Sequence, residues 1–300
     1  MKILIILNGI SHKKKQFYSR ILPTLQQKFE VTVSETTYAG HALALAAESI
    51  TKKFDCVLSA GGDGTLHQVI NGILRKVDQQ KIPSIGVIPL GSGNDFATAC
   101  GLTSDPISIV QLLQANKPKP TDVGKINCWD NNGSEVQKYF INVCSVGMGP
   151  ATVKRMEHQP KWMSSDVRYF VSIIQTFLSH RPEPLEIKTE HGNWKGSARV
   201  FAIANGKSFG NKIYIAPDAL PDDGIFNTFL ASDLSLFRFL LYLQLIKQKR
   251  KPMDEKIMYS AGTAFDLTSS QNCTLEAEGE LVGYLPARIE LAEKAILFLR

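Results

Sequence analysis

The first candidate for chemistry in this sequence is Asp63, which lies in the glycine-rich segment Gly61-Gly62-Asp63-Gly64-Thr65. Glycines let a backbone approach a ligand closely, and an apolar helical pattern begins directly afterwards at Leu66. The N–H groups at the start of a helix bind phosphate, but a carboxylate among them repels phosphate unless a cation intervenes. We therefore predict a nucleotide-phosphate site with Mg²⁺, in preference to a turn in which Asp63 only caps the helix.

A second glycine turn, with the sequence GSGNDFA at residues 91–97, follows an apolar run that ends at Leu90. It brings another carboxylate, Asp95, to the same predicted edge of a sheet as Asp63. A third acid, Asp122, follows Thr121 where the chain leaves its first half. On its own Asp122 is weak evidence, since an acid at such a junction is more often solvated or a cap. Three carboxylates from three loops would make an oxygen-rich site that holds Mg²⁺ through water.

The elements that must position these turns alternate over the first 120 residues between short β-branched runs and longer helical patterns. This alternation predicts a parallel, doubly wound α/β sheet, which binds ligands beyond the carboxyl ends of its strands. The expected strands are Lys2–Leu7, Val31–Val33, Cys56–Ala60 and Ile85–Leu90, and the expected helices are one marked by Tyr18, Ile21, Leu22, Leu25 and Phe29, then Ala42–Lys52, Leu66–Arg75 and a short one near Asp95.

From about Pro120 the pattern changes to strands separated by turn signals, which predicts an antiparallel β domain. The turn signals are residues 130–133, 191–193 and 222–224, and two helical patterns interrupt the strands at Ser164–His180 and Leu234–Lys249. The Pro-rich stretch at 117–120 is the expected boundary. We expect one domain at residues 1–122 and another at 123–287, with a cleft between them.

The composition is that of a soluble globular chain, with 44% apolar and 21% charged residues. Five cysteines without a CxxC pair indicate reduced thiols and a cytoplasmic protein. No apolar tract approaches the roughly 20 residues that span a bilayer. The net charge of +6 is compatible with anionic lipid, nucleic acid or an ordinary surface.

Two basic runs, at residues 12–15 and 247–251, lack the interleaved aromatic residues that stack on bases. We therefore expect no nucleic-acid partner. Contact with a membrane surface explains the runs at least as well, although for the helix at 234–249 core packing is favoured over an interfacial position. The sequence leaves the oligomeric state open, a homodimer included.

Four motifs stand in the order and spacing of the diacylglycerol kinase catalytic family, which includes bacterial soluble lipid kinases and sphingosine kinases. They are Gly61–Thr65, residues 91–97, residues 216–224 and Glu278-Gly279-Glu280, and the resemblance extends over nearly the whole chain. It implies a diacylglycerol kinase-like, NAD kinase-like α/β domain and a mainly β C-terminal sandwich domain, with the nucleotide site in the interdomain cleft. It also implies that the tail, residues 288–300, returns to the first domain.

The resemblance further assigns roles to individual residues. It implies catalytic roles for Asp63 and for Glu280, which would accept the proton of the substrate hydroxyl from a turn. It implies a Mg²⁺ network on Asp63, Asp95 and Asp122, and a structural Mg²⁺ held by Asp223 with the backbone carbonyls of Leu220 and Ile225. The implied ATP contacts are Asn8, Thr36, Gly61, Gly62, Asp63, Gly64, Thr65, Leu66, His67, Gly91, Ser92 and Asn94.

This chain departs from the family at its first loop, which usually reads N-P-x-S-G and here reads Asn8-Gly9-Ile10-Ser11-His12. Glu278 replaces the usual aspartate of D-G-E, and Ser92 replaces a common threonine. The predicted function is ATP- and Mg²⁺-dependent phosphorylation of diacylglycerol or a related lipid, by a cytoplasmic protein that associates peripherally with the membrane. The alternatives are an NAD kinase-like enzyme, which shares the GGDGT turn, and a nucleotide- or lipid-binding sensor without turnover.

Overall fold

The computed structural model describes residues 1–75, 82–160, 162–210 and 212–300, and the chain forms two compact units. Unit 1 contains Met1–Thr121 together with Lys294–Arg300, and unit 2 contains Asp122–Glu293. Each unit has its own hydrophobic core.

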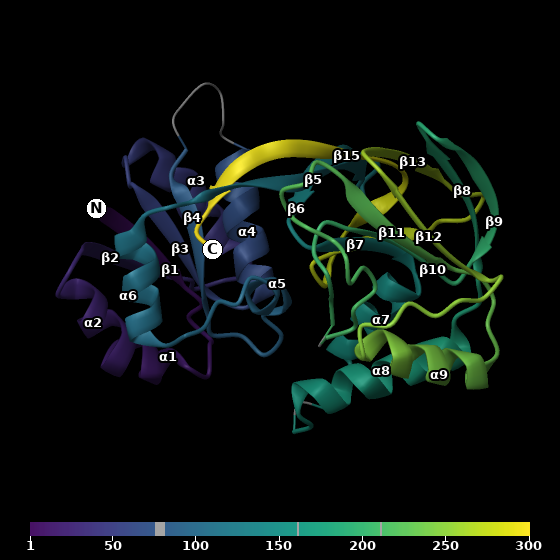
Figure 1. The fold of residues 1–300 in the computed structure, drawn as a ribbon, viewed down its shortest axis with the longest axis horizontal. Coiled ribbons are helices and arrows are strands. Elements are labelled where there is room, and N and C mark those ends of the chain that lie inside the picture. The colour runs from purple at the N-terminus through teal and green to yellow at the C-terminus, as the bar shows by residue number, and fades with distance from the viewer. Residues whose placement is uncertain (76–81, 161, 211) are drawn as a thin grey trace. The chain divides into compact units, whose positions relative to one another are not determined.

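Unit 1 is a parallel sheet with helices on both faces (Figure 1). Its strand order is β2-β1-β3-β4, and the end of β15 pairs with β4. The predicted doubly wound α/β fold is therefore confirmed. The elements of this unit are β1 (Lys2–Leu7), α1 (Lys14–Gln16), the π-helical η1 (Phe17–Ile21), α2 (Leu22–Gln26), β2 (Glu30–Glu35), α3 (His41–Thr51), β3 (Cys56–Gly61), α4 (Asp63–Leu74), β4 (Ser84–Pro89), α5 (Asp95–Ala99) and α6 (Pro106–Ala115).

The two faces of this sheet explain its composition. Every residue of β3 and β4 is buried, as expected for parallel strands covered on both sides. Phe17, Ile21 and Leu25 cover one face from the N-terminal helices. On α4, a Cβ at Gly72 would lie 2.2 Å from the carbonyl oxygen of Leu43, so this glycine allows α3 and α4 to pack closely.

In unit 1, helices α4 and α6 differ most clearly from the sequence prediction. Helix α4 begins at Asp63 and not at Leu66, because the extended Gly62 is its N-cap and the glycine-rich residues enter the first turn. Helix α6 was not predicted at all. Its start has clear signals, since Asp105 accepts the N–H of Ser108 at 2.9 Å and Pro106 occupies the first turn.

Unit 2 is mainly antiparallel β structure with three helices among its described residues. One run of strands has the order β12-β11-β10-β7-β14, and β15 pairs with β14 through its first residues and with β13 and β5 further along. The elements are β5 (Lys119–Trp129), β6 (Glu135–Phe140), β7 (Val143–Gly147), α7 (Met148–Glu157), α8 (Ser165–Ser179), β8 (Glu183–Thr189), β9 (Gly192–Ala198), β10 (Val200–Ala204), β11 (Phe226–Ala231), α9 (Leu236–Lys247), β12 (Ile257–Gly262), β13 (Ala264–Thr268), β14 (Thr274–Ala277) and β15 (Glu280–Phe298).

The core of unit 2 lies between the strands, where Phe140, Phe226 and Phe265 are fully buried. Phe140 and Phe226 stack at 5.5 Å between ring centroids. This arrangement confirms the predicted mainly β sandwich domain and its two predicted helices. The third helix, α7, was not predicted.

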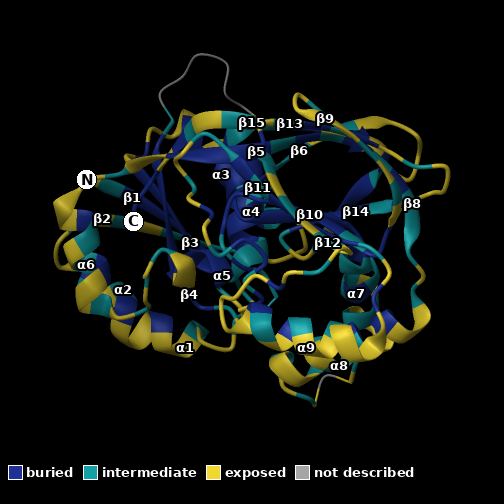
Figure 2. Ribbon diagram, turned by 45° about the vertical axis from the view of Figure 1, so that its right-hand side comes forward, coloured by how far each residue is buried: buried dark blue, intermediate teal, exposed yellow. Residues whose placement is uncertain are grey.

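Helices α8 and α9 lie side by side (Figure 2). Phe177 of α8 stacks on Phe239 of α9, with ring centroids 4.1 Å apart. Leu243 and Ile246 of α9 are buried against the strands. Phe237, at 77% exposed, lies on the open side of the same helix. The expected core packing of this segment therefore holds for one face of α9, while the other face is exposed. No helix in the described ranges is long and apolar enough to cross a membrane.

Candidate functional site

The two glycine turns meet at the carboxyl ends of β3 and β4. The N–H groups of Leu90 and Gly91 both donate to the carbonyl of Gly61, at 2.9 and 3.1 Å. A Cβ at Gly91 would lie 2.4 Å from the Cα of Gly62, so no larger residue fits without moving the backbone. The contact between Gly62 and Gly91 brings the residues that follow each turn to one place.

Asp63 and Asp95 are the residues brought together there. The carboxylate of Asp63 accepts the backbone N–H groups of Asp95 at 3.2 Å and Phe96 at 3.4 Å. A Cβ at Gly93 would lie 3.0 Å from an oxygen of Asp63 and 3.6 Å from one of Asp95, so both carboxylates face the same small space. Burial, and then repulsion from Asp95, raises the pKa of Asp63. The pair is electrostatically suited to a cation.

The first loop supplies polar groups to the same edge of the sheet. The side-chain amide of Asn8 donates to the hydroxyl of Thr65 at 3.3 Å. Gly9 donates its N–H to the hydroxyl of Thr36 at 3.0 Å, and a Cβ on Gly9 would lie 2.2 Å from the Thr36 carbonyl oxygen. The proline usual at this position has no N–H to donate. The loop conformation of this chain therefore requires glycine at position 9 and would not accept the usual proline.

Four further residues predicted to contact the nucleotide, Leu66, His67, Asn94 and Ser92, differ in their surroundings. Leu66 and His67 are buried, at 2% and 5% exposed, and the N–H of Leu66 donates to Gly62. Asn94 adopts a left-handed conformation and exchanges two hydrogen bonds with Gly91, so it holds the second turn in shape. Ser92, by contrast, is exposed.

Asp122 belongs to unit 2, where it is fully buried. Its carboxylate accepts the N–H of Gly224 at 2.9 Å, and its own N–H donates to Pro221 at 2.8 Å. Burial, and to a lesser degree Asp122, raises the pKa of Asp223. The described residues include no group of three or more His, Cys, Asp or Glu side chains arranged to hold a metal ion. Asp122, on β5, thus binds the backbone of the loop at 217–225, which carries the predicted ligand Asp223.

Glu280 is the first residue of β15 and is partly exposed. Its predicted place within a turn is wrong, because the turn consists of Glu278 and Gly279, with φ values of 57° and 77°. The carboxylate of Glu278 accepts the N–H groups of Ile141 at 2.9 Å and Asn142 at 2.6 Å. Glu278 thereby ties the turn to the segment before β7, and Glu280 follows from a fixed position.

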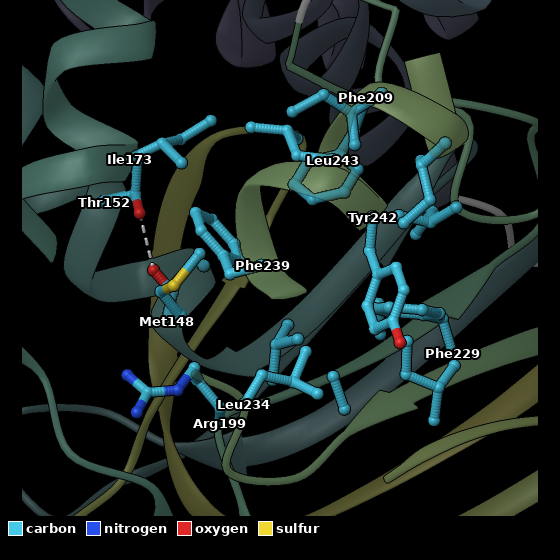
Figure 3. Close-up of a pocket in the computed structure, with 18 of the residues that line it drawn as sticks. Met148, Thr152, Ile173, Arg199, Phe209, Phe229, Leu234, Phe239, Tyr242 and Leu243 are labelled. Atoms are coloured by element: carbon cyan, nitrogen blue, oxygen red, sulfur yellow. Dashed lines mark hydrogen bonds between the residues drawn. The ribbon is translucent and has the colours of Figure 1, made fainter. Parts of the chain in front are cut away.

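Unit 2 also contains an apolar pocket that the sequence did not reveal, between α7, α8, α9 and the strands β10 and β11 (Figure 3). It has a cavity volume of about 80 Å³. Polar groups at its wall bond to protein: Thr152 donates to the Met148 carbonyl at 2.7 Å and Tyr242 to Asp254 at 2.5 Å. The interior therefore presents hydrocarbon, from side chains that include Ile173, Phe229, Phe239 and Leu243.

Arg199 is the one charged side chain among the residues that line this pocket in the described chain. It donates to the carbonyls of Phe177 at 3.0 Å and His180 at 2.8 Å, and so caps the end of α8. It also pairs with Asp233, just before α9. Arg199 thus fixes two helices that form the pocket and leaves the interior apolar.

Two family models match the chain. The diacylglycerol kinase catalytic domain matches residues 2–126, and the YegS C-terminal NAD kinase beta sandwich-like domain matches residues 142–300. A diacylglycerol kinase of Bacillus subtilis (strain 168) is 28% identical over 286 residues, covering 94% of this chain and 90% of the relative. A probable YegS-like lipid kinase of Klebsiella pneumoniae (strain 342) is 26% identical over 293 residues, covering 98% and 94%.

Solved structures show the same fold. A diacylglycerol kinase structure from Bacillus anthracis str. Sterne has a TM-score of 0.74 at 20% identity, covering 99% of this chain and 96% of that one. Yeast NADH kinase bound to NADH has a TM-score of 0.58 at 11% identity, covering 99% and 82%. The two family models match successive parts of the chain and together cover most of it. This protein therefore belongs to the lipid kinase family that joins a diacylglycerol kinase catalytic domain to a YegS-type C-terminal domain.

Proposed function

We propose that this protein transfers the γ-phosphate of ATP to the hydroxyl of a membrane lipid in a Mg²⁺-dependent reaction, with diacylglycerol or a close relative as acceptor. The observation that carries the proposal is the contact of Gly62 with Gly91, which gathers Asp63 and Asp95 at the start of α4. The family relationship supports it, because one relative is named a diacylglycerol kinase and another a probable lipid kinase.

The nucleotide would bind at the carboxyl edge of the unit 1 sheet. The first N–H groups of α4, from Asp63 and Gly64, lack intrahelical partners and suit phosphate oxygens. Asn8, Thr36 and the exposed Ser92 would add polar contacts, with the backbone from Gly61 to Thr65. Leu66 and His67 would support this turn from the core side, because their side chains are buried.

The donor set fits Mg²⁺, which prefers carboxylate oxygens and retains several waters. The raised pKa of Asp63 supports this assignment, since a bound cation would relieve both its burial and its repulsion from Asp95. When bound, the ion would offset charge on the phosphates. We assign Asp63 and Asp95 to this network, whereas the buried Asp122 of unit 2 accepts the N–H of Gly224 and would support the loop at 217–225. We assign Asp223, with the carbonyls of Leu220 and Ile225, to a separate structural ion.

Glu280 is proposed as the general base. A lipid alcohol is a weak nucleophile, and a carboxylate that accepts its proton lets the hydroxyl oxygen bond to the γ-phosphorus as the bond to ADP breaks. Its partial exposure and its fixed position after the Glu278-Gly279 turn are compatible with that role.

The lipid substrate would bind to unit 2. The apolar lining of the pocket would suit the hydrocarbon of a lipid. The exposed apolar face of α8 and α9, formed by Phe170, Phe237, Leu240 and Leu241, would rest on the membrane. The basic residues 247–251 follow directly and suit an anionic surface. This arrangement supports peripheral association with the membrane.

Purified protein incubated with labelled ATP, Mg²⁺ and a panel of lipids in mixed micelles tests the proposal, with NAD as a second acceptor. We expect label in a lipid phosphate, strongest for diacylglycerol-like alcohols, and none without Mg²⁺. Label in NADP and in no lipid would favour the NAD kinase-like alternative, to which the fold of the yeast enzyme is related. Nucleotide or lipid binding without transfer would favour the sensor.

A further inference from the structure

Glu276 is a buried acid that the proposed reaction does not use. It lies on β14 directly opposite Ser145 of β7 and is only 2% exposed. One carboxyl oxygen accepts the hydroxyl of Ser145, and the other accepts the backbone N–H of Gly279 at 3.0 Å. This acid therefore connects the central strands of unit 2 to the turn that precedes Glu280.

The surroundings of Glu276 hold it in one place. A Cβ at Gly149, in the first turn of α7, would lie 2.0 Å from the Ser145 hydroxyl oxygen and 3.3 Å from a carboxyl oxygen of Glu276. The start of α7 thus closes over the Ser145–Glu276 pair. Burying a carboxyl group costs free energy that its hydrogen bonds only partly offset, whereas an apolar residue of similar size would carry no such cost. A local role for this acid explains its presence better than stability does.

The turn held by Glu276 needs external support. Both of its residues, Glu278 and Gly279, have positive φ, which for a residue with a side chain is unfavourable. Glu278 is anchored by its hydrogen bonds from Ile141 and Asn142. Gly279 is anchored by Glu276. Each half of the turn therefore has its own carboxylate anchor.

We propose that Glu276 is a positioning residue for Glu280: by accepting the N–H of Gly279, it fixes the peptide from which Glu280 extends and so directs the carboxylate that receives the substrate proton. The inference rests on the proposed role of Glu280 as general base. Small displacements of a catalytic group lower the rate of the chemical step without altering nucleotide binding. The effect of losing this hydrogen bond should therefore appear in kcat.

The test compares Glu276→Leu, Glu276→Gln, Glu280→Gln and the double variant Glu276→Leu/Glu280→Gln, in the full chain. Lipid phosphorylation, KM for ATP and melting temperature are measured for each. Glu276→Leu should lower kcat about 10–100-fold at unchanged KM for ATP. Glu276→Gln should recover to within about threefold of the parent, because its amide oxygen still accepts the N–H of Gly279. Glu186→Leu, which removes a half-exposed acid from β8, is the matched control and should leave kcat unchanged.

The double variant separates positioning from general damage. If Glu276 acts through Glu280, the double variant should be no slower than Glu280→Gln alone. Three results would overturn the inference. They are additive losses of kcat in the double variant, a normal kcat for Glu276→Leu, and a fall in kcat that occurs only when the melting temperature falls as well. A normal kcat for Glu280→Gln would instead remove the proposed base, and this inference with it.

If Glu276→Leu does not fold, Glu276→Met replaces it in the test, because the unbranched side chain of methionine adapts to the same space. It should give the same loss of kcat and the same absence of additivity. If both apolar variants fail to fold while Glu276→Gln folds, Glu276 serves the fold itself, and the positioning role is wrong.

Discussion

The carboxylate of Asp63 accepts the backbone N–H of Asp95 at 3.2 Å. The pKa of Asp63 is raised, first by burial and second by repulsion from the Asp95 carboxylate. Asp63 is thus held in place by the backbone of Asp95, although the two negatively charged side chains repel each other. Such a pair gains from a cation and loses charge balance without one. The arrangement directs the first prediction.

Asp63→Asn should abolish turnover while the fold survives. The amide keeps the shape and one oxygen acceptor for the N–H of Asp95, but it removes the charge that would attract Mg²⁺ in the proposed site. We expect kcat to fall at least 100-fold, and the melting temperature to stay level or rise because the repulsion from Asp95 is gone. Kinetics and thermal melting measure the two effects. Activity within about threefold, a barrier change under roughly 1 kcal/mol, would refute the assignment.

Gly91→Ala should disrupt the nucleotide site. The new methyl group would lie 2.4 Å from the Cα of Gly62, and only a backbone shift relieves that contact. We expect a loss of about 1–3 kcal/mol in unfolding free energy together with weak ATP binding, measured by chemical denaturation and calorimetric titration. Gly133→Ala is the control, since its positive φ costs about 1–2 kcal/mol with nothing within 4 Å of the new methyl group. Equal ATP affinity in both variants would contradict the prediction.

Asp223→Ala and Glu280→Gln should separate a structural role from a chemical one. Loss of Asp223, which accepts the N–H of Ile225 at 3.2 Å, should lower stability and activity together, by a few kcal/mol at most. Loss of the proposed base should lower kcat by roughly 10²–10⁴ with ATP affinity and melting nearly unchanged. Melting, ATP binding and lipid phosphorylation are measured side by side. An early-melting Glu280→Gln protein would show that the base has been assigned to the wrong residue.

Glu276 should make stability depend on pH. Burial raises the pKa of Glu276 from 4.5 to about 7, so the folded protein holds this proton more tightly than the unfolded chain. Its favourable contribution is complete below pH 4.5 and is lost as pH rises to about 7, a change of about 3 kcal/mol. Glu276→Gln lacks the titrating group. Urea unfolding of both proteins from pH 4.5 to 7.5 should show Glu276→Gln gaining relative stability as pH rises, whereas a constant difference would contradict the pKa direction.

Phe237→Asp should weaken binding to vesicles that contain anionic phospholipid. This side chain is 77% exposed on α9, so the change costs little stability and puts a charge on the proposed membrane-facing surface. We expect at least a tenfold loss in vesicle affinity by sedimentation. Ile107→Asp on α6, at 64% exposed, is the control and should bind like the parent protein. Equal losses in both variants would indicate a general charge effect.

Much of the fold was predictable because its signals are local. The βα alternation and the glycine turns depend on residues adjacent in sequence, and the predicted strands of unit 1 match the observed ones closely. The start of α4 was misplaced because Gly62 and Gly64 have low helix propensity, although one is the N-cap and the other lies in the first turn. Helix α7 follows Gly147, whose positive φ is a feature that sequence periodicity does not report.

The site was harder to predict where it depends on contacts between distant residues. The Ser145–Glu276 pair joins residues 131 positions apart, and neither residue stands in a motif. Likewise Asp122 meets Gly224 across 102 positions, a contact that its local sequence does not announce. The apolar pocket requires α8 and α9 to cover one face of the strands, and hydrophobic periodicity does not distinguish a wall of a pocket from a packed core.

The last residues of the chain have a consequence for how the protein is made. Lys294–Arg300 belong to unit 1, where Phe298 is fully buried and the N–H of Leu299 donates to Ile85 at 2.8 Å. Translation proceeds from the N-terminus, so the ribosome has already produced all of unit 2 before this strand exists. Until then β4 lacks this neighbour and the nascent unit 1 exposes apolar surface. Unit 1, although synthesis of it begins first, is therefore completed only after unit 2.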